Sequence, residues 1–227
     1  ISYKAGLIAA QTWADYINIG FEHGAFDILG LGEFMRGLVD GGPTRSGHRT
    51  PAVIVEAPVD GESEQTIRAN SWQFRQILAR GVHGIILCHA ETPGAIRAFV
   101  ESCRFPFQKL GMDSGLGQGR RGSGGQASAA AIWGISDEEY LKIADPWPLN
   151  PKGELLLGLK FENSRTLTTI KESVAIPGIA YAEYGPGDQA LSLGYSALQT
   201  EPFPQDMLEI RDLVFNSCRS AGITLLD

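Results

Sequence analysis

The chain has 227 residues and a formal net charge of −7, with 43% hydrophobic and 20% charged residues, a composition that indicates a folded globular protein and excludes a disordered one. Its three cysteines exclude a disulfide-stapled scaffold and are typical of a reducing compartment, so we expect a cytoplasmic protein. The acidic balance argues against a general nucleic-acid binder, and no apolar run approaches the ~20 residues of a membrane span.

Short apolar segments alternate with amphipathic stretches along the chain. From the N-terminus, the apolar segments predict buried strands at Tyr16–Phe21, Ala52–Val55, Gly84–Cys88, Leu155–Phe161, Ile179–Tyr184 and Ile223–Leu226. The amphipathic stretches predict helices at Leu29–Val39, Asn70–Ala79, Pro93–Ser102, Arg165–Ser173 and Pro204–Ala221. Continuous apolar runs, rather than strict alternation, are typical of a parallel sheet that is covered on both faces. The sequence therefore predicts a single α/β domain over residues 1–227.

One irregular insertion, at about residues 105–150, interrupts the alternation. It holds a glycine-rich stretch, one predicted helix at Asp137–Ala144 and a loop rich in proline and tryptophan. Insertions of this length are more often active-site loops than linkers. Within it, Gly117–Gly122 matches the GxGxxG pattern, but no strand precedes it, which argues against a dinucleotide site. Two interpretations remain: a loop whose Arg120 or Arg121 binds a substrate carboxylate, or a flexible surface loop.

Acidic residues and histidines follow the predicted strands. They lie in the segments Phe21–Asp27, Val55–Asp60, Cys88–Thr92, Lys160–Asn163 and Glu183–Asp188. Ligands of parallel α/β folds bind at the carboxyl ends of the strands, so we expect these side chains to share one rim, where they converge if the sheet closes into a barrel.

Glu162 and Asp188 are the pair with the clearest chemical meaning. Each lies at or just past a buried strand, and the two strands are predicted to be neighbours. Two carboxylates at neighbouring strand ends suit Mg²⁺ or Mn²⁺. The alternative is that each carboxylate caps the helix that follows it. His23, which follows the first strand, is either a general base or a hydrogen-bonded structural histidine.

Several segments together resemble the motifs of a known family. Ile19–Asp27 reads IGFEHGAFD, Lys160–Glu162 reads KFE and Ile176–Gly194 reads IPGIAYAEYGPGDQALSLG. Arg104–Pro106 begins a further motif, which Gly119–Gly122 ends after an insertion. In these segments the chain resembles the HpcH/HpaI aldolase family of class II, metal-dependent pyruvate aldolases, a family that also includes macrophomate synthase.

The resemblance implies a (β/α)₈ TIM barrel in which Glu162 and Asp188 hold Mg²⁺ or Mn²⁺ and His23 is the acid/base residue. It implies cleavage or formation of a carbon–carbon bond through the enolate of pyruvate or a related 2-oxo acid, with an aldehyde as the second reactant. It also implies a homo-oligomer, with hexamers known in the family. The residues expected to line the substrate site are Glu56, Arg120, Arg121, Lys160, Gly185, Pro186 and Gly187.

The chain departs from the family pattern at three positions. Glu56 stands where the family has a substrate-binding arginine, Gly20 where it has an aspartate, and Lys160 where it has a glutamine. A carboxylate in place of a cation opposes the binding of an anion. Lys160 is expected to pair with Glu56 or, like Arg120 or Arg121, to supply the missing positive charge.

Two alternatives to an aldolase stay open. One is a catalytically altered barrel that serves as a pseudoenzyme or as a binding or assembly component. The other is a CoA-ester lyase of the citrate-lyase β type, which shares the barrel and the carboxylate pair. Against the family pattern, the predicted strands correspond to the second through the seventh of eight, so we expect a barrel that lacks its first and last strands.

Overall fold

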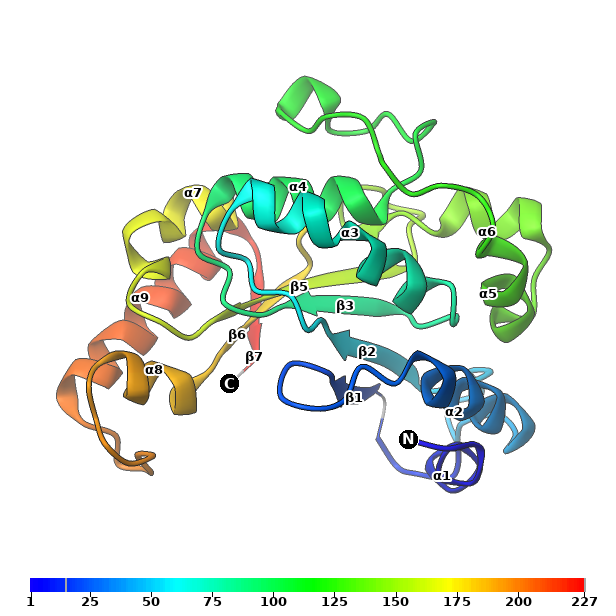
Figure 1. Cartoon of the computed structure of the whole chain (residues 1–227), viewed down its shortest axis with the longest axis horizontal. Helices are drawn as coiled ribbons and strands as arrows, with labels where there is room; N and C mark the ends of the chain where they lie inside the picture. The colour runs from blue at the N-terminus through cyan, green and yellow to red at the C-terminus, as the bar shows by residue number, and fades with distance from the viewer. Residues whose placement is uncertain (15, 227) are drawn as a thin grey trace.

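The computed structural model describes residues 1–14 and 16–226. Its main feature is a curled parallel sheet in the order β1-β2-β3-β5-β6-β7, with the short strand β4 paired to β5 (Figure 1). Every pairing is parallel, and the register runs from Tyr16 beside Ala52 to Glu183 beside Leu226. The strands are β1 Tyr16–Gly20, β2 Ala52–Glu56, β3 Gly84–Leu87, β4 Pro146–Trp147, β5 Leu155–Phe161, β6 Tyr181–Tyr184 and β7 Thr224–Leu226.

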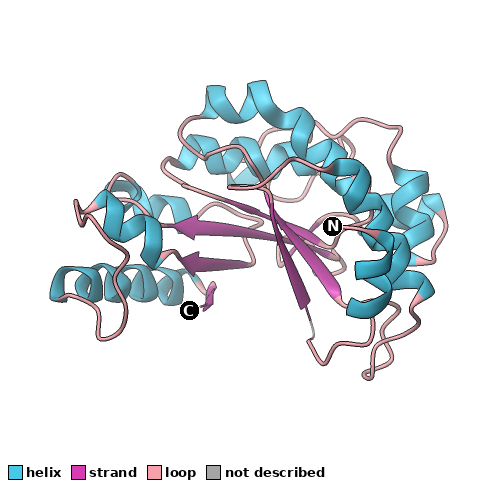
Figure 2. Cartoon of the chain, turned by 60° about the horizontal axis from the view of Figure 1, so that its bottom comes forward, coloured by secondary structure: helices cyan, strands magenta, loops and turns pink. Residues whose placement is uncertain are grey.

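The helices lie around the outer side of this sheet, and its inner side is open (Figure 2). The α-helices are α1 Tyr3–Ala9, α2 Ile28–Asp40, α3 Glu64–Leu78, α4 Pro93–Cys103, α5 Gln126–Trp133, α6 Asp137–Ile143, α7 Ile170–Val174, α8 Pro186–Ser192 and α9 Gln205–Ala221. Two 3₁₀ turns, Met112–Ser114 and Thr166–Thr169, complete the elements. None of the helices in the described ranges is long and apolar enough to cross a bilayer.

The hydrophobic core lies between the sheet and the helices. Alternate strand residues such as Val53, Ile85 and Leu157 are fully buried there, as expected for strands whose outer side chains face helices. A smaller cluster, formed by Ile54, Ile86, Ala180 and Tyr181, lies apart from this core. The two clusters correspond to the two faces of the sheet.

The structure has the predicted α/β architecture, but its sheet forms only part of a barrel. Six parallel strands form a curled half-barrel rather than a complete eight-stranded barrel. The predicted strands agree with the observed ones to within two residues at each end. The elements that were not predicted include α5, β4, α8 and the 3₁₀ turn Met112–Ser114, and the stretch predicted as one helix at Arg165–Ser173 is a 3₁₀ turn followed by α7.

Helices α1 and α2 cross at two glycines. A Cβ atom on Gly6 would collide with the backbone oxygen of Phe34, and one on Gly37 would collide with that of Tyr3. The two helix backbones are therefore in direct contact, which only glycine permits at these positions. This contact fixes α1 against the outer side of α2.

The insertion lies at the end of the sheet opposite to the predicted site. It follows α4, which returns the chain to the amino-terminal ends of the strands. There, Trp133 and Trp147 of the insertion line a cavity of about 750 Å³ together with Ala52, His83 and Leu156, residues at or just before the starts of strands. This part of the insertion therefore lies away from the strand ends at which the site was expected, and its role as an active-site loop stays a prediction.

A buried ion pair fastens this insertion to α4. The guanidinium of Arg104 donates from Nε to Oδ1 of Asp145 at 2.7 Å and from Nη1 to the backbone oxygen of Leu110 at 2.7 Å. The side chains of Arg104 and Asp145 are each only 1% exposed. The pair holds the two ends of the insertion together.

All three cysteines are buried, and none forms a disulfide. Cys88 follows β3, Cys103 ends α4 and Cys218 lies on α9. Burial raises the pKa of the Cys103 thiol to about 12 and that of Cys218 to about 11. Burial also raises the pKa of Cys88. These thiols are packing residues, as the absence of a catalytic pattern in the sequence predicts.

Candidate active site

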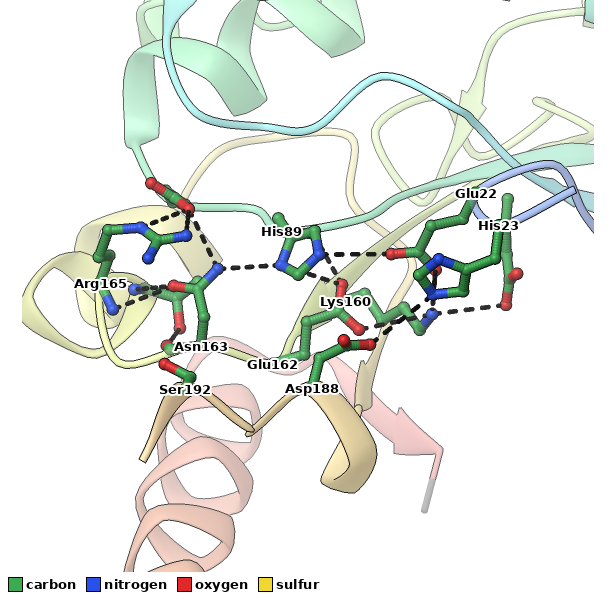
Figure 3. Close-up of polar contacts among 12 residues, drawn as sticks. Glu22, His23, His89, Lys160, Glu162, Asn163, Arg165, Asp188 and Ser192 are labelled. Carbon is green, nitrogen blue, oxygen red and sulfur yellow. Dashed lines mark hydrogen bonds and ion pairs between the residues drawn. The ribbon is translucent and has the colours of Figure 1, made fainter. Parts of the chain in front are cut away.

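The carboxyl ends of the parallel strands bring a set of charged side chains together. Glu22 and His23 follow β1, Glu56 ends β2 and His89 follows β3. Lys160 lies on β5, Glu162 follows it, and Asp188 lies in the first turn of α8. Figure 3 shows most of these side chains pointing toward one another. The predicted convergence at one rim is therefore present, although the sheet is only a half-barrel.

Lys160 is the cation at the centre of the rim. Its Nζ donates to Oε2 of Glu22 at 2.6 Å and lies 3.4 Å from Oε2 of Glu162 and 3.7 Å from Oε1 of Glu56. Burial alone would raise the pKa of the Glu22 carboxyl, but the hydrogen bond and charge of Lys160 outweigh it and lower that pKa. Burial would likewise lower the pKa of Lys160, but Glu22 and its other acidic neighbours raise it. Lys160 therefore stays protonated, as an ammonium group surrounded by carboxylates.

The pairing of Lys160 differs in part from the prediction. Lys160 was expected to pair with Glu56 or to supply the missing positive charge. It does form an ion pair with Glu56 at 3.7 Å, but its hydrogen bond goes to Glu22. Glu56 instead accepts a hydrogen bond from Nδ2 of Asn18 at 3.0 Å. Gly20 lies beside it, and a Cβ atom there would be 2.7 Å from Oε2 of Glu56. The absence of a side chain at Gly20 therefore leaves room for the carboxylate of Glu56.

Glu162 is the most deeply buried carboxylate of the rim. Its side chain is 0% exposed, and its Oε1 accepts a hydrogen bond from the backbone N–H of His89 at 2.8 Å. Its Oε2 is buried and accepts no hydrogen bond, and the same holds for Oε1 of Glu22. Burial raises the pKa of Glu162 despite the charge of Lys160 nearby. An orphaned carboxylate oxygen is costly, so these two oxygens favour a further positive group at this place.

The glycine after β6 allows α8 to approach this carboxylate. A Cβ atom on Gly185 would lie 2.5 Å from Oε2 and 2.7 Å from Cβ of Glu162. Pro186 and Gly187 then form the first turn of α8, which carries Asp188. These three residues were predicted to bind substrate. The structure places them at the rim, where they support the carboxylates, and their contact with a substrate stays a prediction.

His23 and Asp188 lie at the outer side of the rim. Nε2 of His23 is 3.6 Å from Oε2 of Glu22 and 3.8 Å from Oδ2 of Asp188, and the His23 side chain is 72% exposed. The ring therefore stands between two carboxylates and remains accessible to solvent. This position is compatible with the predicted role in proton transfer.

His89 was not among the predicted site residues, yet it lies between Glu22 and Glu162 at the rim. Its Nε2 is 3.5 Å from Oε1 of Glu22, and its Nδ1 is 3.7 Å from Oε1 of Glu162 and 3.0 Å from Nδ2 of Asn163. Its φ of 45° is positive, and no other non-glycine residue in the described ranges has a positive φ. Left-handed backbone costs energy outside glycine and is concentrated at functional sites.

Two groups of side chains have the spacing of cation ligands. Glu22, His23 and Asp188 form one, and Glu22, His89 and Glu162 form the other. Their carboxylate oxygens are hard ligands suited to Mg²⁺ or Mn²⁺, and one buried oxygen each of Glu22 and Glu162 accepts no hydrogen bond from the described residues. The residues present therefore fit a divalent cation, with Glu22 as a candidate ligand that the sequence did not suggest.

Arg120 and Arg121 do not belong to this rim. Arg121 is 3% exposed, donates from Nη2 to the hydroxyl of Tyr140 at 2.6 Å and stacks on the ring of Phe105. Arg120 is exposed on the same insertion. The structure places both on the insertion, away from the strand ends that carry the rim, and their contact with a substrate stays a prediction.

Comparisons with known proteins support the fold. No family model matches the sequence, and no curated protein matches it. Among solved structures, an HpcH/HpaI aldolase/citrate lyase family protein from Burkholderia cenocepacia J2315 superimposes with a TM-score of 0.75 at 22% identity, over 99% of this chain and 74% of the other.

Two further structures extend the likeness. Macrophomate synthase has a TM-score of 0.68 at 18% identity, over 99% of this chain and 67% of its own. The protein CitE from Mycobacterium tuberculosis, solved with magnesium and acetate, has a TM-score of 0.52 at 12% identity, over 100% of this chain and 70% of its own. The chain thus has the fold of HpcH/HpaI aldolases and their lyase relatives, which confirms at the level of the fold the resemblance seen in the motifs.

Proposed function

We propose that this chain is a metal-dependent carbon–carbon lyase of the aldolase type that acts on a 2-oxo acid. The observation that carries the proposal is the buried Oε2 of Glu162, which accepts no hydrogen bond from the described residues, on a rim that also presents Asp188 from the next strand–helix connection. Mg²⁺ or Mn²⁺ would be held by Glu162 and Asp188, with Glu22 beside them. The magnesium ion bound by the structurally similar CitE supports this choice of cation.

When bound, the cation would supply Lewis-acid polarisation of the substrate carbonyl. Side chains of the chain itself would attract the substrate and transfer protons. Lys160 provides the positive charge nearest to these carboxylates, so it is the group that attracts an anionic substrate in place of the family's arginine. His23, exposed and flanked by Glu22 and Asp188, holds or releases a proton at Nε2.

The test is the exchange of pyruvate's methyl protons in D₂O, followed by proton NMR with and without Mg²⁺ or Mn²⁺. We expect cation-dependent loss of the methyl signal in the wild type and none in Glu162→Gln or Asp188→Asn. Glu138→Gln is the matched control, because Glu138 lies on the exposed surface of α6 and pairs only with Lys142. Exchange that persists in both site variants would contradict the assignment of the carboxylate pair.

A second candidate function is a barrel that binds a cation and an acid without turnover. It is favoured by Glu56, a carboxylate 3.7 Å from Lys160, and by the hydrogen bond that commits Lys160 to Glu22. Under this alternative, calorimetry detects Mg²⁺ binding that is lost in Glu162→Gln, while pyruvate shows no exchange with either metal.

A further inference from the structure

Asn163 has only one possible orientation of its amide. Its Oδ1 accepts hydrogen bonds from the backbone N–H groups of Arg165 at 3.0 Å and Thr166 at 3.2 Å. Rotating the amide by half a turn would place its NH₂ group against two donors and lose both bonds. The usual ambiguity between the oxygen and nitrogen of an asparagine is therefore resolved by the backbone.

The NH₂ group of Asn163 consequently faces two acceptors. Nδ2 donates to Oε1 of Glu91 at 3.1 Å and is 3.0 Å from Nδ1 of His89. Glu91 is itself held by the guanidinium of Arg165, whose Nε donates to the same oxygen at 2.8 Å (Figure 3). Because Nδ2 is a donor, Nδ1 of His89 must present its lone pair, and a neutral ring then carries its proton on Nε2.

The backbone of His89 is fixed as firmly as its ring. The positive φ turns its N–H toward Oε1 of Glu162, at 2.8 Å, and the next N–H, of Ala90, donates to the backbone oxygen of Lys160 at 3.2 Å. The side chain is 20% exposed. Its Nε2 points toward Oε1 of Glu22 at 3.5 Å, an oxygen that accepts no hydrogen bond. The ring thus presents an unused N–H between the two buried carboxylates.

We propose that Asn163 locks His89 in the tautomer protonated on Nε2, so that His89 is a fixed hydrogen-bond donor to an oxygen atom of the bound acid. Asn163 is the positioning residue, and His89 contacts the ligand. The role of His89 toward an acid rests on the proposed function, whereas the tautomer does not. A preoriented donor stabilises negative charge on a carbonyl or carboxylate oxygen without having to reorient first.

The same tautomer removes His89 from the candidate cation ligands. Its Nδ1 lone pair is used by Asn163, and its Nε2 carries a proton. The remaining candidate ligands are then Glu22 with Glu162 in one group, and Glu22 with Asp188 and His23 in the other. A ligand set dominated by carboxylates favours Mg²⁺ or Mn²⁺ over softer metals.

The tautomer is tested by long-range ¹H–¹⁵N NMR of the imidazole nitrogens in the full chain without added metal. We expect an unprotonated Nδ1 and a protonated Nε2 for His89 in the wild type. In the double variant Asn163→Asp with Glu91→Gln, an acceptor faces Nδ1, so the proton should move to Nδ1. Glu91→Gln alone is the matched control and should keep the wild-type pattern. A protonated Nδ1 in the wild type, or an unchanged pattern in the double variant, would overturn the proposal.

The donor role is tested by titrating the chain with oxalate in the presence of Mg²⁺. His89→Leu removes the donor, whereas His89→Gln keeps an N–H at the far end of a polar side chain with the same backbone cost. We expect His89→Leu to weaken oxalate binding about tenfold, the loss of one hydrogen bond to a charged oxygen, and His89→Gln to recover most of it.

The NMR experiment and the oxalate titration test separate parts of the proposal, and either part can be refuted alone. Equal affinity of the wild type and His89→Leu would refute the donor role. If oxalate with Mg²⁺ fails to bind the wild type at all, the proposed function falls and the donor role falls with it, while the NMR result still decides whether Asn163 sets the tautomer.

Discussion

At the scale of single residues, the ammonium of Lys160 decides the charge balance of the rim. It is hydrogen-bonded to Glu22, whose side chain is 4% exposed, and it lies near the fully buried Glu162. Removing one partner of a buried pair leaves the other charge uncompensated. We therefore expect the stability of the rim and its proposed affinity for a cation to be coupled through this one side chain.

We expect Lys160→Met to lower the free energy of unfolding by about 3 kcal/mol in the absence of divalent salt. Added Mg²⁺ should restore more stability to this variant than to the wild type, because the carboxylates then lack their internal cation. Urea unfolding with and without MgCl₂ measures both effects. Lys142→Met, which removes an exposed ion pair with Glu138, should show neither. Equal responses of Lys160→Met and the wild type to Mg²⁺ would contradict the coupling.

His83, at the opposite edge of the sheet, makes the fold sensitive to acid. Its Nδ1 accepts a hydrogen bond from the backbone N–H of Val53 at 3.0 Å, its ring stacks on Trp133, and burial lowers its pKa to about 4. The unfolded chain binds a proton here near pH 6.5 and the folded chain only near pH 4, so the contribution is complete above pH 6.5 and is lost as the pH falls between these values.

Between about pH 7.5 and about pH 5, this group should remove about 2 kcal/mol from the free energy of unfolding. His83→Asn keeps an acceptor for Val53 but does not titrate, so its stability should fall less over the same interval. Denaturant unfolding at the two pH values gives the comparison. An identical drop in the wild type and the variant would mean that other groups cause the acid sensitivity.

The rim shows which residue-level features a sequence can and cannot predict. Glu162, Asp188 and His23 were found because the carboxyl ends of parallel strands share one edge, a rule that needs no coordinates. The Lys160–Glu22 bond joins residues 138 positions apart, and it depends on side-chain directions that no motif records. The role of His89 depends on a positive φ and on the orientation of Asn163, and neither leaves a pattern in the sequence.

At the scale of elements, the helices that the sequence missed are those without an apolar stripe. The segment of α5 is dominated by alanine, and α8 begins with Pro186-Gly187 after Gly185, a sequence that is more typical of a turn than of a helix. Proline at the first helical position nevertheless suits a helix, since its fixed φ is helical and its missing N–H is not needed there. The strands were predicted well because their continuous apolar runs are long enough to be distinguished from loops.

The glycine contact between α1 and α2 gives a prediction at this scale. Gly37→Ala would place a methyl group against the backbone oxygen of Tyr3, so α1 must move away. We expect a loss of about 2 kcal/mol in stability and faster amide exchange within α1. Hydrogen exchange followed by mass spectrometry localises the effect.

Gly32→Ala is the matched control on the same helix. The atom nearest to its new methyl group would be Cδ of Arg80 at 3.2 Å, on a flexible side chain. This variant should be unchanged or more stable by up to about 1 kcal/mol, because alanine favours the helix. Unaltered exchange of α1 in Gly37→Ala would show that the two helices do not depend on this contact.

At the scale of the whole molecule, the rim and the insertion occupy opposite ends of the sheet. Arg120 and Arg121 were expected at the site from the family resemblance, with a flexible surface loop as the alternative, and a motif does not record the end of the sheet at which a loop lies. A connection that follows a helix in a parallel α/β fold returns to the amino-terminal edge, away from the ligand edge. The strand–helix alternation predicts a curled parallel sheet, but it does not predict how far that sheet closes toward a barrel.

This separation predicts that stability and binding respond to different residues. Asp145→Asn leaves the charge of Arg104 buried and unpaired, so it should cost about 3 to 5 kcal/mol of stability. At a temperature where the variant is folded, its affinity for oxalate with Mg²⁺ should equal that of the wild type. Arg120→Gln should change neither quantity. A weaker affinity in both variants would place the insertion at the site after all.

The three buried cysteines can report local opening of the native molecule. Alkylating reagents react with the thiolate, which requires both exposure and a lowered pKa, so each thiol becomes reactive only while its surroundings are open. Cys88 lies beneath the rim, Cys103 at the junction of α4 with the insertion, and Cys218 on the last helix. The rates at which the three sites are labelled therefore rank the opening of the ligand edge, the insertion and the C-terminal layer in one native sample, with no foreign label introduced.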